Sequence, residues 1–182
     1  MKSFLYSAWE TMEIILVAVI AVVIIRNFLV QPFLVSGASM EPSFSSGDYL
    51  LIDEAVYRFR VPQRGEVAVF RYPGDESTFY IKRIVGLPGE KIEINNGSIT
   101  IFNTQNPNGF ILSENYLPVG HKTSGQEEVV LKSDEYFVMG DNRNYSFDSR
   151  SWGNLPKSEI VGLVRLRLWP FNKVMAVEKP AY

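Results

Sequence analysis

The sequence predicts a mostly β fold, in which a single N-terminal transmembrane helix is followed by one β-rich domain. Residues 9–30 are predominantly apolar, and beyond Pro32 the chain changes to short strand-like runs separated by Gly and Pro. No helical periodicity recurs after that point. The 182 residues, 46% hydrophobic and 21% charged, provide enough chain for one folded domain and a short appendage.

The N-terminal apolar segment is the first feature of the chain. Residues 14–25 form an unbroken run of twelve apolar residues, which spans about 18 Å as a helix, less than the ~30 Å hydrocarbon core of a bilayer. Apolar flanks extend it to residues 9–30, about 33 Å, which is long enough to cross. Its charged residues lie towards the two ends, within reach of headgroups. We expect residues 1–8 to be a short tail and residues 9–30 a membrane anchor.

This segment has two other interpretations. A cleaved secretory signal also has a short apolar core, but Arg26, Asn27 and Gln31 follow this one, and the first small-x-small sites, around Val35 to Ala38, lie about ten residues further on. A buried helix of a soluble protein is less usual so near the terminus. An uncleaved anchor therefore fits best, although the few flanking cations leave its orientation poorly specified.

Residues 31–182 predict one β domain. Turn signals separate its strand-like runs, and the strongest, Asn95-Asn96-Gly97, predicts a hairpin. The stretch 103–126 is polar and rich in Asn, Gly and Pro, which indicates a variable loop or small cap. The expected strands are Tyr49–Ile52, Val67–Arg71, Phe79–Val85, Lys91–Ile94, Ser98–Phe102, Glu128–Leu131, Tyr136–Met139 and Val161–Leu168.

Charge and residue counts exclude several functions. The formal net charge of −2 argues against a nucleic-acid partner, which requires a basic surface. The absence of cysteine removes disulfides and thiolate chemistry. Because His121 is the only histidine, a Ser-His-Asp triad or a histidine metal site would depend on that one residue.

Ser39 is a candidate nucleophile. It lies in a turn sequence bounded by Gly37 and Pro42. Small neighbours leave its hydroxyl sterically open, and a turn can present backbone N–H groups to a developing oxyanion. Most serines in such turns are capping or loop residues, so Ser39 alone does not identify an active site.

Lys82 is a candidate general base. Strand alternation places Lys82 on one face of its run and Arg83 on the other, so one of these cations must accompany apolar neighbours inward. A buried lysine loses hydration, its pKa falls, and its neutral amine can deprotonate a serine where no histidine serves. In the alternative interpretation both cations reach solvent from an edge strand.

A third candidate is the polar run from Met139 to Arg150. In an extended chain Asp148 and Arg150 face the same way and could pair, and Ser146 could hydrogen-bond and orient a lysine. The same run would be unremarkable as a solvated loop. None of the three motifs is decisive alone.

Together and in this order, the motifs resemble those of bacterial type I signal peptidases, the membrane-bound Ser-Lys proteases that remove signal peptides from exported proteins. Residues 103–126 match nothing diagnostic. The matching segments after the anchor are Ser36–Ser43 (the nucleophile box), Gly47–Leu51, Arg64–Phe70, Tyr80–Glu90 (the lysine box), Gly140–Arg150 (the final box) and Trp169–Phe171 (a frequent tail).

The resemblance implies a role for each matching residue. Ser39 would be the acylated nucleophile and Lys82 the general base. Ser146 would orient Lys82, and Asp148 and Arg150 would form a supporting ion pair.

It also implies that Met40 lines the substrate pocket and that the Ser39 backbone N–H donates to the oxyanion. One departure concerns Gly37, because some members place a second oxyanion-donating serine there. The second donor of this chain must then be a backbone group or is missing. Ser43 stands where threonine is usual.

The implied protein sits in the cell (plasma) membrane with residues 1–8 in the cytoplasm and residues 31–182 as a catalytic domain on the extracytoplasmic face. Its partners would be the lipid bilayer and exported preproteins with small residues at the first and third positions before the cut, selected by small apolar pockets. The resemblance implies no metal or cofactor and no particular oligomeric state.

Two other functions compete with that of a signal peptidase. A self-cleaving Ser-Lys regulator fused to a DNA-binding domain has little support, because only 38 residues precede Ser39 and no Ala-Gly dipeptide, the bond such regulators often cut, occurs. An inactive membrane-tethered module that binds peptides would be indicated by loss of Ser39 or Lys82, yet both are present. We expect His121 to be exposed in the variable loop.

Overall fold

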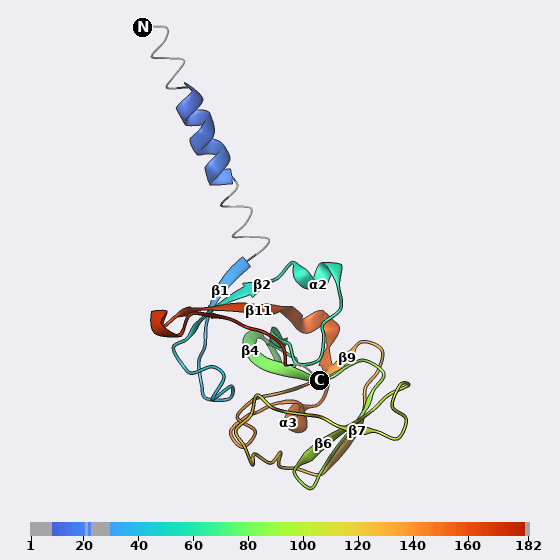
Figure 1. Cartoon of the computed structure of the whole chain (residues 1–182). Helices are drawn as coiled ribbons and strands as arrows, with labels where there is room; N and C mark the ends of the chain where they lie inside the picture. Colours follow the sequence, from blue (N-terminus) through green and yellow to red (C-terminus); the bar gives the residue numbers. More distant parts are fainter. Residues whose placement is uncertain (1–8, 21, 23–29, 181–182) are drawn as a thin grey trace, which may run out of the picture.

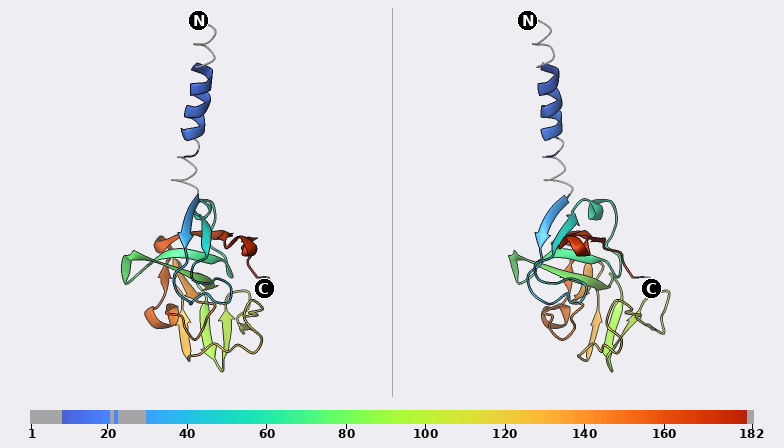
Figure 2. Two further views of the ribbon diagram at one scale, coloured as in Figure 1. Left: turned by 90° about the vertical axis from the view of Figure 1, so that its left-hand side faces the viewer. Right: turned by 60° about the vertical axis from the view of Figure 1, so that its left-hand side comes forward.

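A computed structural model describes residues 9–20, 22 and 30–180. Residues 9–20 are helical and exposed, and this helix stands clear of the β domain in every view (Figures 1 and 2). Within the described residues, no helix is both long and apolar enough to cross a membrane. The remainder of the predicted anchor, apart from residues 22 and 30, and the predicted tail lie outside the described residues.

The larger sheet is antiparallel throughout, with the strand order β1-β2-β11-β3-β4-β9-β10 and with β12 paired to β11. It forms the upper part of the domain in Figure 1. Its strands are β1 Val30–Leu34, β2 Tyr49–Asp53, β3 Val67–Tyr72, β4 Asp75–Gly86, β9 Glu135–Met139, β10 Leu155–Pro156, β11 Ile160–Trp169 and β12 Met175–Ala176.

A smaller antiparallel sheet has the order β7-β6-β5-β8 and lies at the end of the domain far from the N-terminal helix (Figures 1 and 2). Its strands are β5 Lys91–Asn95, β6 Ser98–Phe102, β7 Phe110–Ile111 and β8 Glu127–Val130. The short helices are α2 Val56–Phe59 and α3 Ser149–Trp152, and the 3₁₀ turns are η1 Lys157–Glu159 and η2 Phe171–Lys173.

All eight predicted strands are present, although several ends differ by a few residues. The predicted hairpin is confirmed, since Asn95 pairs with Ser98 across a two-residue turn. Asn96 and Gly97 have φ values of +53° and +86°, the left-handed pair of conformations that this tight hairpin turn requires.

The sequence analysis did not predict the first strand. Val30 opens β1 instead of ending the helix, and Pro32 lies inside this strand. The strand is compatible with proline because β1 forms the edge of the larger sheet, where an N–H group can be missing. An apolar run that continues directly from an apolar helix does not reveal such a change of backbone geometry.

The core forms three clusters of buried side chains around the two sheets. One fills the space between the smaller sheet and strands β4 and β9 and includes Ile92, Ile101 and Phe137. A second lies below the connection between β1 and β2 and includes Met40 and Leu50. Strand β4 is therefore covered on both faces along its C-terminal half.

The sequence analysis expected one of the two adjacent cations to point inward, and this double coverage buries both. Lys82 and Arg83 are both 4% exposed. Lys82 points towards the connection between β1 and β2, and the Tyr116 ring, from the segment predicted as a loop or cap, lies 4.1 Å from the Arg83 guanidinium on the other face. The stretch 103–126 thus covers one face of β4.

Candidate active site

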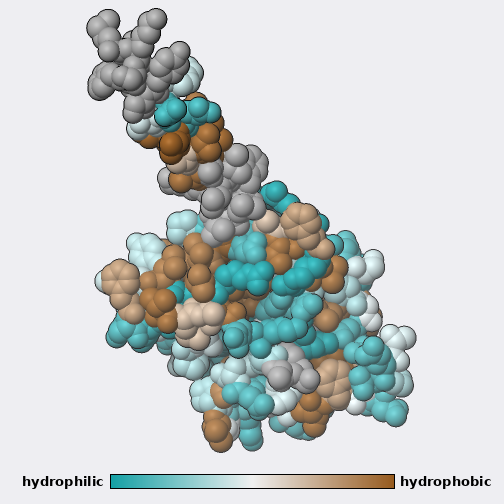
Figure 3. All heavy atoms as spheres, turned by 45° about the horizontal axis from the view of Figure 1, so that its top comes forward, coloured by the Kyte–Doolittle hydropathy of each residue, from teal (hydrophilic) through white to brown (hydrophobic). Residues whose placement is uncertain are grey.

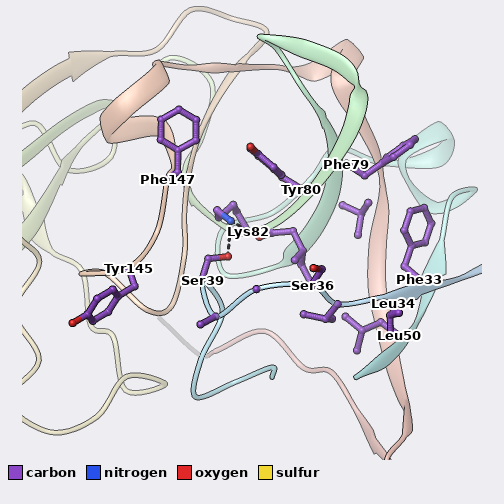
Figure 4. Close-up of a pocket in the computed structure, with 15 residues that line it drawn as sticks. Phe33, Leu34, Ser36, Ser39, Leu50, Phe79, Tyr80, Lys82, Tyr145 and Phe147 are labelled. Carbon is purple, nitrogen blue, oxygen red and sulfur yellow. Dashed lines mark hydrogen bonds between the residues drawn. The ribbon is translucent and has the colours of Figure 1, made fainter. Parts of the chain in front are cut away.

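Ser39 lies in the long connection 35–48 between β1 and β2. The backbone N–H of Phe44 donates to the carbonyl of Met40 at 2.9 Å, which closes a helical type of turn immediately after Ser39. The side chains of Met40 and Phe44 are buried in the core. Their packing fixes the turn on its core side, so that the Ser39 hydroxyl faces a cavity (Figure 4).

Lys82 reaches Ser39 from the middle of β4. Its Nζ donates to Ser39 Oγ at 2.7 Å and to the carbonyl of Ile81 at 3.0 Å (Figure 4). Because Lys82 pairs with Ala68 on the neighbouring strand β3, its backbone is held inside the sheet. The two candidates, 43 residues apart in the chain, are thereby in direct contact.

The burial of Lys82 changes its acidity. Loss of hydration lowers its pKa from 10.5 to about 8, and the carboxylates of Asp148 and Asp141 act in the opposite direction. A substantial fraction of the amine is therefore neutral at mildly alkaline pH. A neutral amine beside a serine hydroxyl can accept the hydroxyl proton.

Ser39 and Lys82 line a cavity of about 340 Å³. Figure 4 shows Phe33, Leu34 and Phe79 on one side of the pair, with Tyr145 and Phe147 on the opposite side. The remaining lining residues are Val35, Ser36, Gly37, Ala38, Leu50, Val69, Tyr80 and Ile81. The walls are mostly apolar, and the residues immediately before Ser39 are small.

Met40 does not lie where the sequence analysis expected it. Its side chain is 1% exposed and packs in the core with Val35 and Phe44, and it is absent from the lining of the cavity. Consecutive side chains at this turn point in different directions, so the orientation that turns Ser39 into the cavity turns Met40 into the core.

The final polar run supports the same region. Asp148 is fully buried, and Arg150 donates to both of its carboxylate oxygens at 2.8 Å, which is the ion pair that their spacing predicted. Asp148 also accepts the backbone N–H of Gly140 at 3.1 Å. The carboxylate therefore ties the end of β9 to the start of α3.

Within the part of the chain that the structure describes, Ser146 makes no hydrogen bond to Lys82. Within the described residues its Oγ is buried and lacks a hydrogen-bond partner, and the hydrogen bonds of Lys82 go to Ser39 and Ile81. Ser146 packs against Gly140, where an added Cβ would lie 2.3 Å from Ser146 Oγ and 2.3 Å from the Ser39 carbonyl oxygen. Glycine at 140 therefore permits this close approach.

Asn142 is a site residue to which the sequence analysis assigned no role. Its backbone N–H donates to the Ser39 carbonyl at 3.0 Å, and its side-chain amide donates to the Ala38 carbonyl at 3.0 Å. These two bonds clamp the nucleophile turn. Its place between the polar residues of the final box was the available signal, but no spacing rule connects it to Ser39.

Arg83 was likewise noticed only as the neighbour of Lys82. It donates to the two oxygens of Asp141 at 2.8 and 2.5 Å and to the carbonyl of Gly65 at 2.8 Å. Both charged side chains are nearly inaccessible. This bidentate pair connects β4 to the loop that contains Asn142.

The sequence analysis expected His121 to be exposed, but it is half-buried, and its Nε2 atom is inaccessible to solvent. Burial lowers its pKa from the usual 6.5. It lines a separate depression with Asn96 and Asn144 and takes no part in the Ser39 cavity. No group of three or more metal-ligating side chains occurs within the described residues.

A mostly β domain that brings a serine hydroxyl and a buried lysine amine together in an apolar cavity has the components of a Ser-Lys hydrolase. The model of the family described as signal peptidase, peptidase S26, matches residues 8–169. The chain belongs to this family, and it is a serine endopeptidase.

Two relatives agree with this assignment by their sequences. The chain is 36% identical over 165 residues to a probable signal peptidase I-2 of Synechocystis sp., which covers 86% of this chain and 71% of that protein. It is 35% identical over 170 residues to a signal peptidase I of Bacillus amyloliquefaciens, with coverages of 88% and 87%. A crystal structure of a signal peptidase I from Enterococcus faecalis is 27% identical, with a TM-score of 0.48, and covers 58% of this chain and 97% of that one.

Proposed function

We propose that this protein is a membrane-anchored endopeptidase that removes N-terminal signal peptides from exported preproteins, with Ser39 as nucleophile and Lys82 as general base. The observation that carries this proposal is the 2.7 Å contact between Lys82 Nζ and Ser39 Oγ inside the cavity. The names of the curated relatives support the choice of substrate.

The reaction is an acyl transfer. The neutral Lys82 amine takes the Ser39 proton as Ser39 Oγ attacks the scissile carbonyl, and the backbone N–H of Ser39 donates to the oxyanion that forms. The ammonium of Lys82 then returns the proton to the departing amine. A water molecule, deprotonated by the same amine, hydrolyses the ester on Ser39 and restores the enzyme.

Three side chains of the final box would support the pair. Ser146 would orient Lys82, since its buried hydroxyl lacks a hydrogen-bond partner in the described structure and packs beside the Ser39 carbonyl. Asp148 and Arg150 would hold the loop that carries Ser146, because their bidentate ion pair also binds the Gly140 N–H. The small residues Gly37 and Ala38 and the apolar walls favour small side chains before the cut.

We also propose that residues 9–29 anchor the protein in the cell membrane, with residues 1–8 in the cytoplasm and the catalytic domain on the extracytoplasmic face. The unbroken apolar run in the sequence supports this, as does a helix whose large apolar side chains are exposed (Figure 3). Leu34 and Phe79 are 57% and 45% exposed and line the cavity. A cleavage site that emerges just beyond a membrane-inserted segment would meet Ser39 there.

Cleavage of a small preprotein by the full chain in detergent tests the assignment. We expect wild type to cut after an Ala-x-Ala site, and Ser39→Ala and Lys82→Ala to lose at least about 10³-fold in kcat while remaining folded. Ser98→Ala and Lys91→Ala change the same residue types in the smaller sheet, outside the lining of the cavity, and should cut normally.

Each contrary result has a distinct meaning. Activity that survives in Lys82→Ala would place the general base elsewhere. A folded wild type that never cuts would favour the peptide-binding module instead.

A further inference from the structure

The stretch 103–126 contacts three arginines around the candidate active site. The Tyr116 ring lies 4.1 Å from the Arg83 guanidinium, and the carbonyl of Ser124 accepts from Arg150 at 3.3 Å. The third arginine, Arg143, makes several hydrogen bonds to this stretch. A segment with no diagnostic sequence motif thus packs against the charged framework of the site.

Arg143 is the most enclosed of these arginines, with a side-chain exposure of 0%. Glu114 forms a bidentate ion pair with it, in which Oε2 accepts from Nη1 at 2.8 Å and Oε1 accepts from Nη2. The hydroxyl of Tyr116 accepts from Nη2 at 3.1 Å and donates to Glu114 Oε1 at 2.7 Å. Thr123 Oγ1 accepts from Nη1. The segment therefore supplies both a neutralising charge and the acceptors for Nη1 and Nη2.

Arg143 connects this segment to the nucleophile turn through its own backbone. Its Nε donates to the Gly140 carbonyl at 3.1 Å, and its carbonyl accepts from Arg150 at 2.7 Å. These bonds fix the backbone on both sides of Asn142. Asn142 in turn holds the carbonyls of Ala38 and Ser39, each at 3.0 Å.

We infer that Glu114 is a positioning residue of the active site, which acts through Arg143 and Asn142 on the geometry of Ser39. The inference rests on the proposed function. A guanidinium buried without a carboxylate must move towards water or draw water in, because an unpaired buried charge is strongly unfavourable. Either response displaces the 140–143 backbone and the clamp on the Ser39 turn.

The consequence for catalysis follows from the proton-transfer geometry. The Ser39–Lys82 contact of 2.7 Å must be kept for Lys82 to take the proton. Glu114 is absent from the cavity lining, so its loss should affect the chemical step and leave substrate binding almost intact. A misplacement of about 1 Å at the reacting atoms costs on the order of 10²-fold in rate.

The test uses Glu114→Gln in the full chain in detergent, with kcat and KM measured on a preprotein. We expect kcat to fall about 10- to 100-fold and KM to stay within about twofold of wild type. Glu128→Gln is the matched control, because Glu128 forms an exposed ion pair with Lys91 at 2.8 Å in β8. This control should keep wild-type kcat.

A double-mutant cycle identifies the route of the effect. If Glu114 acts through Arg143, Arg143→Met should also lower kcat, and the double variant should be no slower than the slower single variant. Additive losses in kcat would overturn the inference. So would a Glu114→Gln variant whose thermal unfolding midpoint falls while kcat, measured below that midpoint, equals wild type.

Thr123→Val keeps the test decisive if Glu114→Gln does not fold. It removes one acceptor from Arg143 and preserves the volume, so we expect a loss of about three- to tenfold in kcat. Wild-type kcat in this variant would then contradict the inference. Failure of the proposed function is recognised separately, because wild type and Glu128→Gln would then both fail to cut.

Discussion

At the scale of single residues, the two neighbouring cations of β4 are treated differently by the fold. Lys82 and Arg83 are equally buried, but Arg83 donates to both oxygens of Asp141, whereas no ion pair among the described residues includes Lys82. A paired buried guanidinium keeps its charge, and an unpaired buried amine lowers its pKa. The sheet therefore contains one structural cation and one titratable amine, side by side.

This difference predicts the pH dependence of cleavage. Since only the neutral Lys82 amine can take the Ser39 proton, kcat/KM should rise as pH increases through a pKa of about 8 and level off above it. The value of kcat/KM rises with pH because the protonated form of Lys82 cannot act as the base. Preprotein cleavage measured in neutral and mildly alkaline buffers checks this expectation.

His121→Ala provides the control for that profile. His121 lies outside the cavity, and burial moves its pKa below 6.5, so the variant should retain the wild-type pH profile. A profile whose rising limb disappears in His121→Ala would assign the base to histidine and reject the Ser-Lys mechanism.

At the scale of elements, the nucleophile turn depends on a glycine two residues before Ser39. Gly37 has a φ of +96°, a conformation that residues with a side chain rarely adopt. Space is not the constraint, because an added Cβ at this position would have no heavy atom within 4 Å. The backbone conformation of this turn therefore requires the glycine at position 37, where some members of the family have a serine.

Substitution of this glycine should affect both stability and rate. Gly37→Ala should destabilise the fold by about 1–3 kcal/mol because of backbone strain, and kcat should fall as the Ser39 N–H and Oγ shift. Gly89→Ala is the comparison, since Gly89 has a φ of +77° in the turn between β4 and β5 and an added Cβ there would also have no heavy atom within 4 Å. It should lose similar stability with kcat unchanged, as measured by chemical denaturation and cleavage. Equal kcat losses in both variants would refute a local effect at the site.

At the scale of the whole molecule, β1 lies at the edge of the larger sheet and reaches the catalytic cavity. Figures 1 and 2 show the helix of residues 9–20 and strand β1 at the same end of the domain. Phe33 and Leu34, at the end of this strand, line the cavity, and the Phe33 ring lies 5.6 Å from that of Phe79. The cavity is therefore lined by the strand that directly follows the proposed anchor in the sequence.

Truncation before this strand should separate anchoring from catalysis. Removing residues 1–29 leaves β1 in place, so cleavage of a short soluble peptide should stay within about threefold of wild type. Cleavage of a preprotein inserted in vesicles should fall by about 10²-fold or more, because the shared membrane no longer raises the effective concentration. Parallel assays on the two substrates check this.

A longer truncation serves as the comparison. Removing residues 1–34 deletes β1, exposes the edge of β2 and removes Phe33 and Leu34 from the cavity. This variant should lose activity on both substrates. If removal of residues 1–29 left vesicle cleavage unchanged, the proposed anchor would be wrong.

The sequence by itself determined eight of the strands, the main hairpin and the two residues that meet at the site. These features rest on local patterns: alternation in β4, the Asn96-Gly97 turn and small residues around Ser39. Ser39 and Lys82 were candidates because a serine nucleophile needs a base and histidine offered only one candidate. Their roles as a catalytic pair followed from the order of the motifs along the chain and their resemblance to a known family.

Only the tertiary structure decided which side chains face the cavity and which support it. Met40 belongs to the core, both cations of β4 are buried, and Asn142 clamps the nucleophile turn from 104 residues away. The role of Glu114 beside Arg143 is equally invisible to sequence patterns. The physical reason is that burial and hydrogen bonding between distant segments depend on how the two sheets and their connections pack, and no local periodicity encodes that packing.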